Sequence, residues 1–248
     1  MRMAKMRSLG GLAQRPGAAI FLRFQIPAVI MMDDFFPSLL IPGQERTIDS
    51  SARSEDVGVV AVAAHADDLI TALDSLWDVR PNHFAPTRVS YFREGDDIVA
   101  IDFKWMRLTD EAISRLNHLS SLRRLNIHGA HVTDAGLAEL LPLQNLEELN
   151  LGRTQVTNEG MALLKELPNL RRLDVSATAV TDEGVAHIAG IRNLECLYLD
   201  FCRELGDWSI APLLDLEHLH LLHVHGTRVT SIGAEDFAAA RPGCDVVR

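Results

Sequence analysis

The segment His131-Val-Thr-Asp-Ala-Gly-Leu-Ala-Glu-Leu-Leu-Pro-Leu-Gln-Asn-Leu-Glu-Glu-Leu-Asn-Leu-Gly-Arg-Thr154 is one complete unit of a pattern that recurs along the chain. In its second half, Leu146, Leu149 and Leu151 follow the spacing apolar-x-x-apolar-x-apolar. This spacing begins at intervals of 24, 24, 24, 24 and 25 residues, at Ile98, Leu122, Leu146, Leu170, Leu194 and Leu219. Because so short a unit cannot bury its own apolar face, neighbouring copies must stack into one continuous core. The sequence therefore predicts a solenoid.

Each unit predicts a short strand, a turn and a helix. Leu149 and Leu151 alternate at the period of a strand, and the residues between the leucines face away from the core. Upstream, Thr133 can cap a helix with its hydroxyl, and Asp134 follows in the first turn, where the helix dipole favours an acid. The same start signal recurs at Leu108-Thr109-Asp110, Val156-Thr157-Asn158 and Val180-Thr181-Asp182. We therefore expect an α/β fold with a curved parallel sheet on the concave side and helices on the convex side.

Composition divides the chain into four segments. Residues 1–32 form a basic leader, and residues 33–56 contain proline, glycine and a polar run that are typical of a linker. Residues 57–97 are expected to form an N-terminal cap, a helix followed by a strand that covers the first repeat. Residues 98–248 contain the repeats and end in a helix, a proline and a strand start, which we interpret as a C-terminal cap.

The leader allows two interpretations. It carries five basic residues and no acid, which loosely resembles a targeting segment. Alternatively, the start codon is misplaced and Met31 or Met32 is the true first residue. No apolar run approaches the roughly 20 residues that span a bilayer, so we expect no membrane span. We expect a cytoplasmic protein, or a secreted one if residues 1–32 are a genuine targeting segment.

Composition also narrows the classes of function. A net charge of −10 argues against nucleic acid as a partner, because binding through phosphates needs a basic surface. Three cysteines are too few for a disulfide framework in a chain of 248 residues, which favours a reducing compartment. The sequence has no glycine-rich phosphate loop, nucleophile elbow or HExxH motif, so we expect neither an enzyme nor a cofactor. Alanine richness and a strong preference for arginine over lysine are typical of GC-rich coding and suggest a bacterial source.

The phrase Val-Thr-Asp-x-Gly-Leu at 132–137 is echoed at 156–161 and 180–185. These residues resemble the leucine-rich repeat family, and in particular its 24-residue bacterial variety and the relatives that follow F-box domains. The asparagine that is usual after the strand is replaced here by Ala130, Thr154, Thr178, Cys202 and Thr227, which is similar to the cysteine-containing and bacterial classes. Over about 98–248, the resemblance implies a horseshoe that binds another protein and has no chemistry of its own.

The residues between the strand leucines form three outward rows, and these are the candidate partner site. In the first row, Arg124, Glu148 and Arg172 lie on adjacent strands about 4.8 Å apart, so they either contact a partner or simply neutralise one another. Towards the C-terminus the rows become aromatic and apolar, as binding hot spots often are. The full set of candidates is Arg124, Glu148, Arg172, Asp174, Tyr198, Asp200, Phe201, Leu221, His223 and His225. Trp105 and Trp208 are two further candidate anchors.

Other functions are kept as alternatives. The run His218, His220, His223 and His225 raises the possibility of a metal or hydrolytic site, with Asp200 one strand away. Strand alternation weakens this hypothesis, because only His223 and His225 share the outward face, and we expect no metal. A substrate-recognition module of a ubiquitin-ligase-like system or a secreted adhesion repeat is a further alternative, although no F-box-like segment precedes the repeats.

Overall fold

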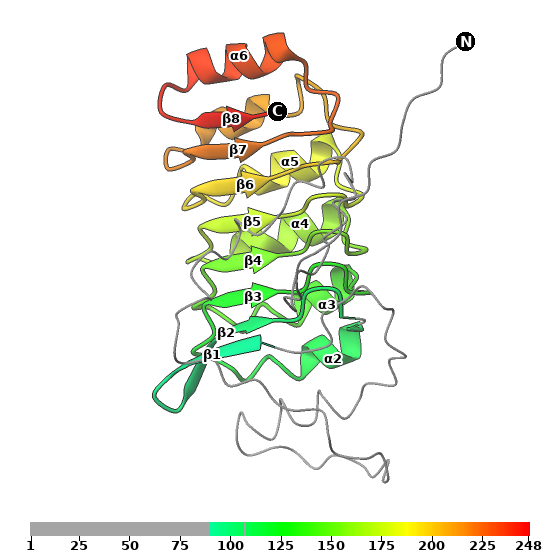
Figure 1. Ribbon diagram of the computed structural model, residues 1–248, viewed down its shortest axis with the longest axis vertical. Helices are drawn as coiled ribbons and strands as arrows, with labels where there is room; N and C mark the ends of the chain where they lie inside the picture. The colour runs from blue at the N-terminus through cyan, green and yellow to red at the C-terminus, as the bar shows by residue number, and fades with distance from the viewer. Residues whose placement is uncertain (1–89, 107) are drawn as a thin grey trace, which may run out of the picture. The chain divides into compact units, whose positions relative to one another are not determined.

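The computed structural model describes residues 90–106 and 108–248. The leader, the linker and most of the expected N-terminal cap at 57–97 lie outside the described residues. Within the described part, one sheet holds the strands in chain order (Figure 1). The strands are β1 (Ser90–Glu94), β2 (Asp97–Asp102), β3 (Arg124–Asn126), β4 (Glu148–Asn150), β5 (Arg172–Asp174), β6 (Cys196–Tyr198), β7 (Leu221–His223) and β8 (Asp245–Val247).

The sheet is parallel from β2 to β8, which confirms the predicted solenoid. Its first pair differs, because β1 runs antiparallel to β2. A tight turn at Gly95, with φ of 65°, joins these two strands. Such a hairpin needs only a short turn, whereas a parallel pair needs a long crossover, and here each crossover contains the helical part of one repeat.

Short helices lie along one side of the sheet (Figure 1). They are the α-helices α2 (Asp110–Ser114), α3 (Asp134–Ala138), α4 (Asn158–Leu163), α5 (Asp182–Ile188) and α6 (Ser231–Ala240), with the 3-10 helices η2 (Leu164–Glu166) and η3 (Ala211–Asp215). The predicted threonines stand at the N-cap positions of α2 to α5. Thr133 accepts a hydrogen bond from the N–H of Ala135, as a helix cap should. Thr230 caps α6 in the same way.

The core is made by the repeated apolar positions. Leu146, Leu149 and Leu151 are all fully buried, and so are their counterparts in the neighbouring repeats. The threonines that replace the usual asparagine close the turn after each strand, because Thr154 and Thr178 each donate a hydroxyl hydrogen bond of 2.6 Å to the strand carbonyl three residues earlier. Strands and turns are therefore tied together in every unit that carries this threonine.

A second contact joins each helix start to the next repeat, and we call it the Thr–Asp–Gly contact. The Asp134 carboxylate accepts hydrogen bonds from the backbone N–H and the hydroxyl of Thr157, at 2.8 and 2.6 Å. Gly160 leaves room for that carboxylate, since a Cβ there would lie 2.2 Å from Asp134 Oδ1. The equivalent trios are Asp110, Thr133 and Gly136; Asn158, Thr181 and Gly184; and Asp207, Thr230 and Gly233. The repeated Thr-Asp-x-Gly phrase is thus the sequence pattern of an inter-repeat contact.

The unit after β6 departs from this pattern. Gly206 stands in place of the threonine and Ser209 in place of the glycine. The Ser209 hydroxyl now donates to the Asp182 carboxylate and accepts from the N–H of Gly206. No α-helix follows among the described residues of this unit, and Pro212 lies at the start of η3 instead. A different hydrogen-bond pattern therefore preserves the contact where the helix is lost.

Candidate partner-binding face

The first two outward rows predicted from the sequence are in register across the sheet, and the third row follows the ends of the strands. We call the three rows together the strand face. In the first row Arg124 pairs with Glu148, and Glu148 with Arg172. Cys196 and Leu221 continue that row on β6 and β7. The predicted alignment of alternating charges is therefore present. Burial raises the pKa of the Glu148 carboxyl, while the positive charges of Arg172 and Arg124 act in the opposite direction.

The middle row is more buried than alternation alone suggests. Asn126, Asn150 and Asp174 each turn the side-chain oxygen back to accept a hydrogen bond from the N–H two residues ahead, at 2.8–3.0 Å. Asp174, a candidate partner residue, is only 1% exposed. Burial, with the nearby negative charge of Asp200 adding to it, raises the pKa of Asp174 to about 6. These three side chains hold the backbone beyond the strands rather than projecting into solvent.

The structure brings the C-terminal candidates together into one cluster. Arg172 donates a hydrogen bond to the Tyr198 hydroxyl at 3.4 Å, and the Tyr198 ring lies 4.6 Å from the His223 ring between centroids. His223 Nδ1 lies 3.6 Å from the Asp200 carboxylate, which also accepts the N–H of His225 at 2.7 Å. Tyr198 and Asp200 are buried within this cluster, whereas Arg172, Leu221, His223 and His225 are partly exposed.

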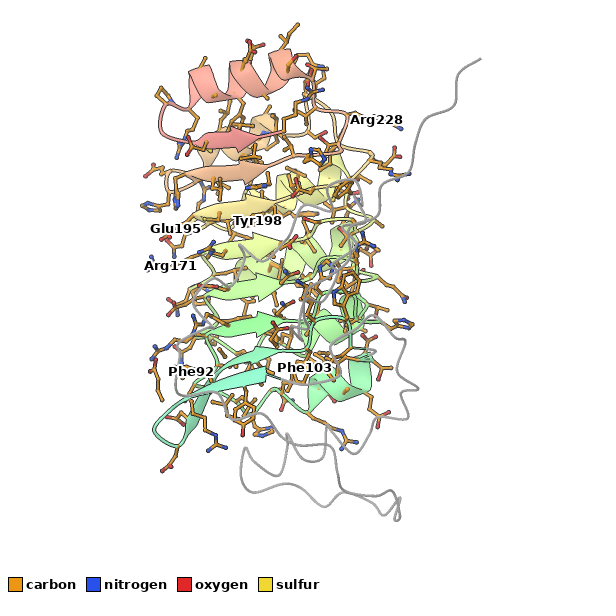
Figure 2. All side chains as sticks on the ribbon, viewed as in Figure 1. Phe92, Phe103, Arg171, Glu195, Tyr198 and Arg228 are labelled. Atoms are coloured by element: carbon orange, nitrogen blue, oxygen red, sulfur yellow. The ribbon has the colours of Figure 1, made fainter. Side chains whose placement is uncertain are left out.

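Opposite ends of the strands carry different groups. Just before β5 and β6, Arg171 and Glu195 form an ion pair of 2.6 Å (Figure 2), whereas Tyr198 is the last residue of β6. His220, just before β7, approaches the Cys196 thiol at 3.6 Å. The histidine run is therefore divided, because His223 and His225 lie on the Asp200 side. In the described ranges, no group of three His, Cys, Asp or Glu side chains is placed to hold a metal ion.

A row of residues with positive, left-handed φ follows the outward rows, and only some of its members were predicted as candidates from the sequence. It consists of Trp105, Gly129, Arg153, Ala177, Phe201 and Gly226, with φ between 55° and 77°. Trp105 and Phe201 were noted as candidates, but Arg153 was missed. The glycines at two of these positions were the available signal, since glycine is the usual residue at positive φ. We call these six residues the left-handed row.

The helix side of the molecule carries a separate exposed aromatic. Trp208 is 89% exposed and precedes η3, where the other repeats begin an α-helix. Ile232, one repeat later in α6, is exposed as well. These two residues belong to the helical side of their repeats and not to the strand face. No helix in the described part of the chain is long and apolar enough to cross a membrane.

Three of the repeats are similar to a known protein family. The family model described as "Leucine Rich repeat" matches residues 118–141, 143–165 and 166–189. Among solved structures, this chain is similar to internalin C2 from Listeria monocytogenes, with 19% identity over 62% of this chain and 86% of that chain, at a TM-score of 0.38. No curated protein matches.

Proposed function

We propose that this protein is a non-catalytic scaffold. It binds another protein on the strand face. Three of its repeats match the leucine-rich repeat family, at 118–141, 143–165 and 166–189, and the repeats stack as a leucine-rich repeat solenoid. Leucine-rich repeat domains generally act as protein-interaction modules, and solenoids offer extended surfaces for that purpose. Within the family, we propose the 24-residue bacterial type.

The observation that carries this proposal is the cluster around Tyr198. Arginine, tyrosine and histidine side chains lie in contact with one another, and their contacts fix their positions before any partner arrives. Preorganised side chains lose less conformational entropy on binding, which increases affinity. Arginine is also a residue type that often dominates binding energy at interfaces, and Arg172 is partly exposed while the buried Tyr198 holds it in place. Leu221 adds an apolar neighbour in the first row, so a partner can cover both kinds of surface.

The proposal includes a reducing location. Cys196, Cys202 and Cys244 are free and buried. Burial raises the pKa of each thiol, which disfavours the reactive thiolate. A chain with this cysteine pattern is suited to the cytoplasm. Secretion is the competing hypothesis, and an N-terminal sequence from the native protein that starts within residues 18–30 would support it.

A capture experiment with the full-length chain tests the scaffold proposal. The test variant combines Arg172→Glu, Leu221→Ala and His223→Ala, which are partly exposed positions of the strand face. The matched control combines Arg192→Glu, Leu214→Ala and Ile232→Ala, which make similar changes at exposed positions elsewhere. Circular dichroism and thermal melting establish that both variants are folded.

We expect a host protein to be captured by the parent chain and the control but not by the strand-face variant. Binding of that protein is then reconstituted from purified components to obtain the dissociation constant of each variant. If the control loses the partner while the strand-face variant keeps it, the strand face is not the binding site.

A further inference from the structure

The left-handed row continues the hydrogen-bond ladder of the sheet beyond the strands. The N–H of Trp105 donates to the carbonyl of His128 at 2.7 Å, and that of Arg153 to the carbonyl of Ser176 at 2.8 Å. The N–H of Phe201 donates to His225 at 2.7 Å, and Gly129 and Ala177 make the same bond in between. Members of the row are therefore held side by side at the spacing of neighbouring strands.

Side-chain size alternates along this row. Large residues stand at Trp105, Arg153 and Phe201, and each is followed one repeat later by Gly129, Ala177 or Gly226. A positive φ is unfavourable for any residue with a bulky side chain. Because glycine occupies the same position in two repeats, the fold itself does not require the large side chains. Their presence at an unfavourable backbone geometry points to a role outside folding.

Each aromatic ring of the row lies over the glycine of the next repeat. A Cβ at Gly129 would come 2.8 Å from the Trp105 ring, and one at Gly226 would come 2.6 Å from the Phe201 ring. Trp105 also packs edge-on against His128, with ring centroids 4.6 Å apart, and Phe201 does the same against His225 at 5.4 Å. Despite these contacts, Trp105 and Phe201 remain 43% and 41% exposed. Two supported aromatic surfaces therefore face solvent, four strands apart.

Arg153 places a positive charge between these aromatic residues. Its guanidinium lies 5.5 Å from the centroid of the Trp105 ring, and the side chain is exposed. Among the residues that the structure describes, no carboxylate forms an ion pair with Arg153. The carboxylates of the strand face are already used, since Asp174 and Asp200 accept backbone N–H groups. In a chain of net charge −10, this exposed cation is locally available to an external acid.

We propose that the ridge of Trp105, Arg153 and Phe201 binds an extended segment of a partner protein that carries a carboxylate between two apolar side chains. The carboxylate pairs with Arg153, and the apolar side chains cover Trp105 and Phe201. This inference rests on the proposed function, because it assumes a protein partner, and it specifies the chemistry of that partner.

The spacing of the ridge defines the sequence of the bound segment. The backbone positions of Trp105, Arg153 and Phe201 lie two strands apart from one to the next, and strands are separated by about 4.8 Å, which gives about 10 Å between these backbone positions. An extended chain advances about 3.3 Å per residue, so about three residues cover that distance. The expected pattern is therefore apolar-x-x-acidic-x-x-apolar.

Charge argues against two other occupants of the ridge. The chain's own residues 1–32 contain no acid, so they lack the group that Arg153 would select. Nucleic acid could supply phosphates, but it would be repelled by a protein of net charge −10. An acidic peptide has the required charge at one point and apolar groups on both sides.

A displayed library of random twelve-residue peptides, selected on the immobilised full-length chain, tests the proposal. We expect the recovered peptides to share an acidic residue with apolar residues about three positions away on each side. Fluorescence anisotropy of the strongest peptide then measures its dissociation constant for the parent and the variants. Arg153→Glu should weaken binding at least tenfold, whereas Arg192→Glu, the same change at an exposed arginine outside the strand face, should not.

The aromatic residues are tested by Trp105→Gly and Phe201→Gly. Glycine suits the positive φ and already occurs at the same position in the neighbouring repeats, so these variants should fold, which circular dichroism checks. Each should weaken the peptide at least tenfold, while Trp208→Gly, which removes an exposed tryptophan from the helix side, should leave binding unchanged.

Several outcomes would overturn the ridge proposal. One is a selection that recovers no peptide or only basic ones, and another is a peptide whose affinity is unchanged by Arg153→Glu. A peptide lost only with Arg172→Glu, Leu221→Ala and His223→Ala would retain the scaffold proposal and move the segment to the Tyr198 cluster. Failure of the scaffold proposal itself is seen separately, in the capture of host proteins.

Discussion

At the scale of single residues, the middle row shows where sequence patterns stop being informative. Strand alternation predicted that Asn126, Asn150 and Asp174 face away from the leucine core, and the pairing register agrees. Strand alternation predicts which side of the sheet a side chain lies on, but it does not predict the rotamer of that side chain. Each of these side chains turns back onto its own backbone, so a polar outward residue is here a structural one. The signal was the presence of asparagine in two strands, since its amide makes the same hydrogen bond without a charge.

That comparison leads to a prediction for Asp174→Asn. The pKa of Asp174 is raised from its ordinary 3.8 to about 6 by burial, so the folded state binds its proton more tightly than the unfolded state. The associated stability is present below about pH 4 and is lost as pH rises through about 6. At pH 7 the buried carboxylate is therefore unfavourable, and the asparagine variant should be more stable by up to about 3 kcal/mol.

Urea denaturation at pH 4 and pH 7 measures this effect. The stability difference between variant and parent should grow from pH 4 to pH 7, while Asp245→Asn, at an exposed position on β8, should show no such growth. A variant that is less stable than the parent at pH 7 would mean that the carboxylate, and not only its oxygen as an acceptor, is needed at this position.

At the scale of secondary-structure elements, the Thr–Asp–Gly contact explains the most regular phrase in the sequence. The threonine and acid were predicted as a helix start. The threonine hydroxyl does cap α3 and α4, but it makes no cap hydrogen bond at α2 or α5. Propensity rules concern one helix at a time, however, and could not predict that the acid bonds to the next repeat. They also gave no reason for a glycine within the helix. Both features depend on the distance between neighbouring helices, which only the stacked structure provides.

The Thr–Asp–Gly contact predicts that one glycine substitution lowers the stability of the protein and that another leaves it nearly unchanged. Gly160→Ala would place a Cβ where the Asp134 carboxylate lies, so both hydrogen bonds to Thr157 would be disturbed. Alanine improves helix propensity by about 1 kcal/mol, but disturbing a hydrogen-bonded charged group costs about 2–3 kcal/mol. We expect a net destabilisation of about 1–2 kcal/mol.

Gly206→Ala is the matched control. No atom lies within 4 Å of a Cβ built at Gly206, and its φ is not in the left-handed region. Stability should change by less than about 0.5 kcal/mol. Chemical denaturation of both variants measures the difference, and equal effects would show that Gly160 is not sensitive to the Asp134 carboxylate.

At the scale of the whole solenoid, spacing alone predicted most of the architecture. The intervals of 24 and 25 residues place Arg124, Glu148 and Arg172 in register, as the strand pairing shows. The same spacing could not predict the loss of the α-helix after β6, because that loss depends on Gly206, Ser209 and Pro212 together. The candidate cluster around Tyr198 was partly predictable for the same reason: register brought the residues together, but their mutual contacts needed side-chain positions.

Stacking also predicts that the repeats do not open equally. In a solenoid each repeat contacts only its neighbours, so end repeats open at lower free energy than interior ones. Cys244 lies beside β8, an edge strand of the described sheet, whereas Cys196 and Cys202 lie in or beside β6, which has a strand on each side. All three thiols are buried, so the structure around each thiol must open before the thiol can react.

Alkylation with iodoacetamide under native conditions, followed by mass spectrometry, measures the three rates. We expect Cys244 to react about tenfold faster than the other two, even though burial raises its folded-state pKa to about 11, because the opened thiol has an ordinary pKa. Identical rates for all three thiols would instead indicate that the described repeats unfold as one unit.

Side-chain size alternates along the left-handed row, so the pattern of large side chains on the surface repeats over two strands, whereas the backbone repeats with each strand. The fold repeats with every strand, but a large side chain returns only with every second one. A ligand displaced by one strand would meet Gly129, Ala177 and Gly226, and would be out of phase with every anchor at once. A displacement by two strands would move one contact past Phe201 and Gly226, the last members of the row that the structure describes. Because large side chains occur only in every second repeat, a partner has a single binding register on a molecule built from near-identical units.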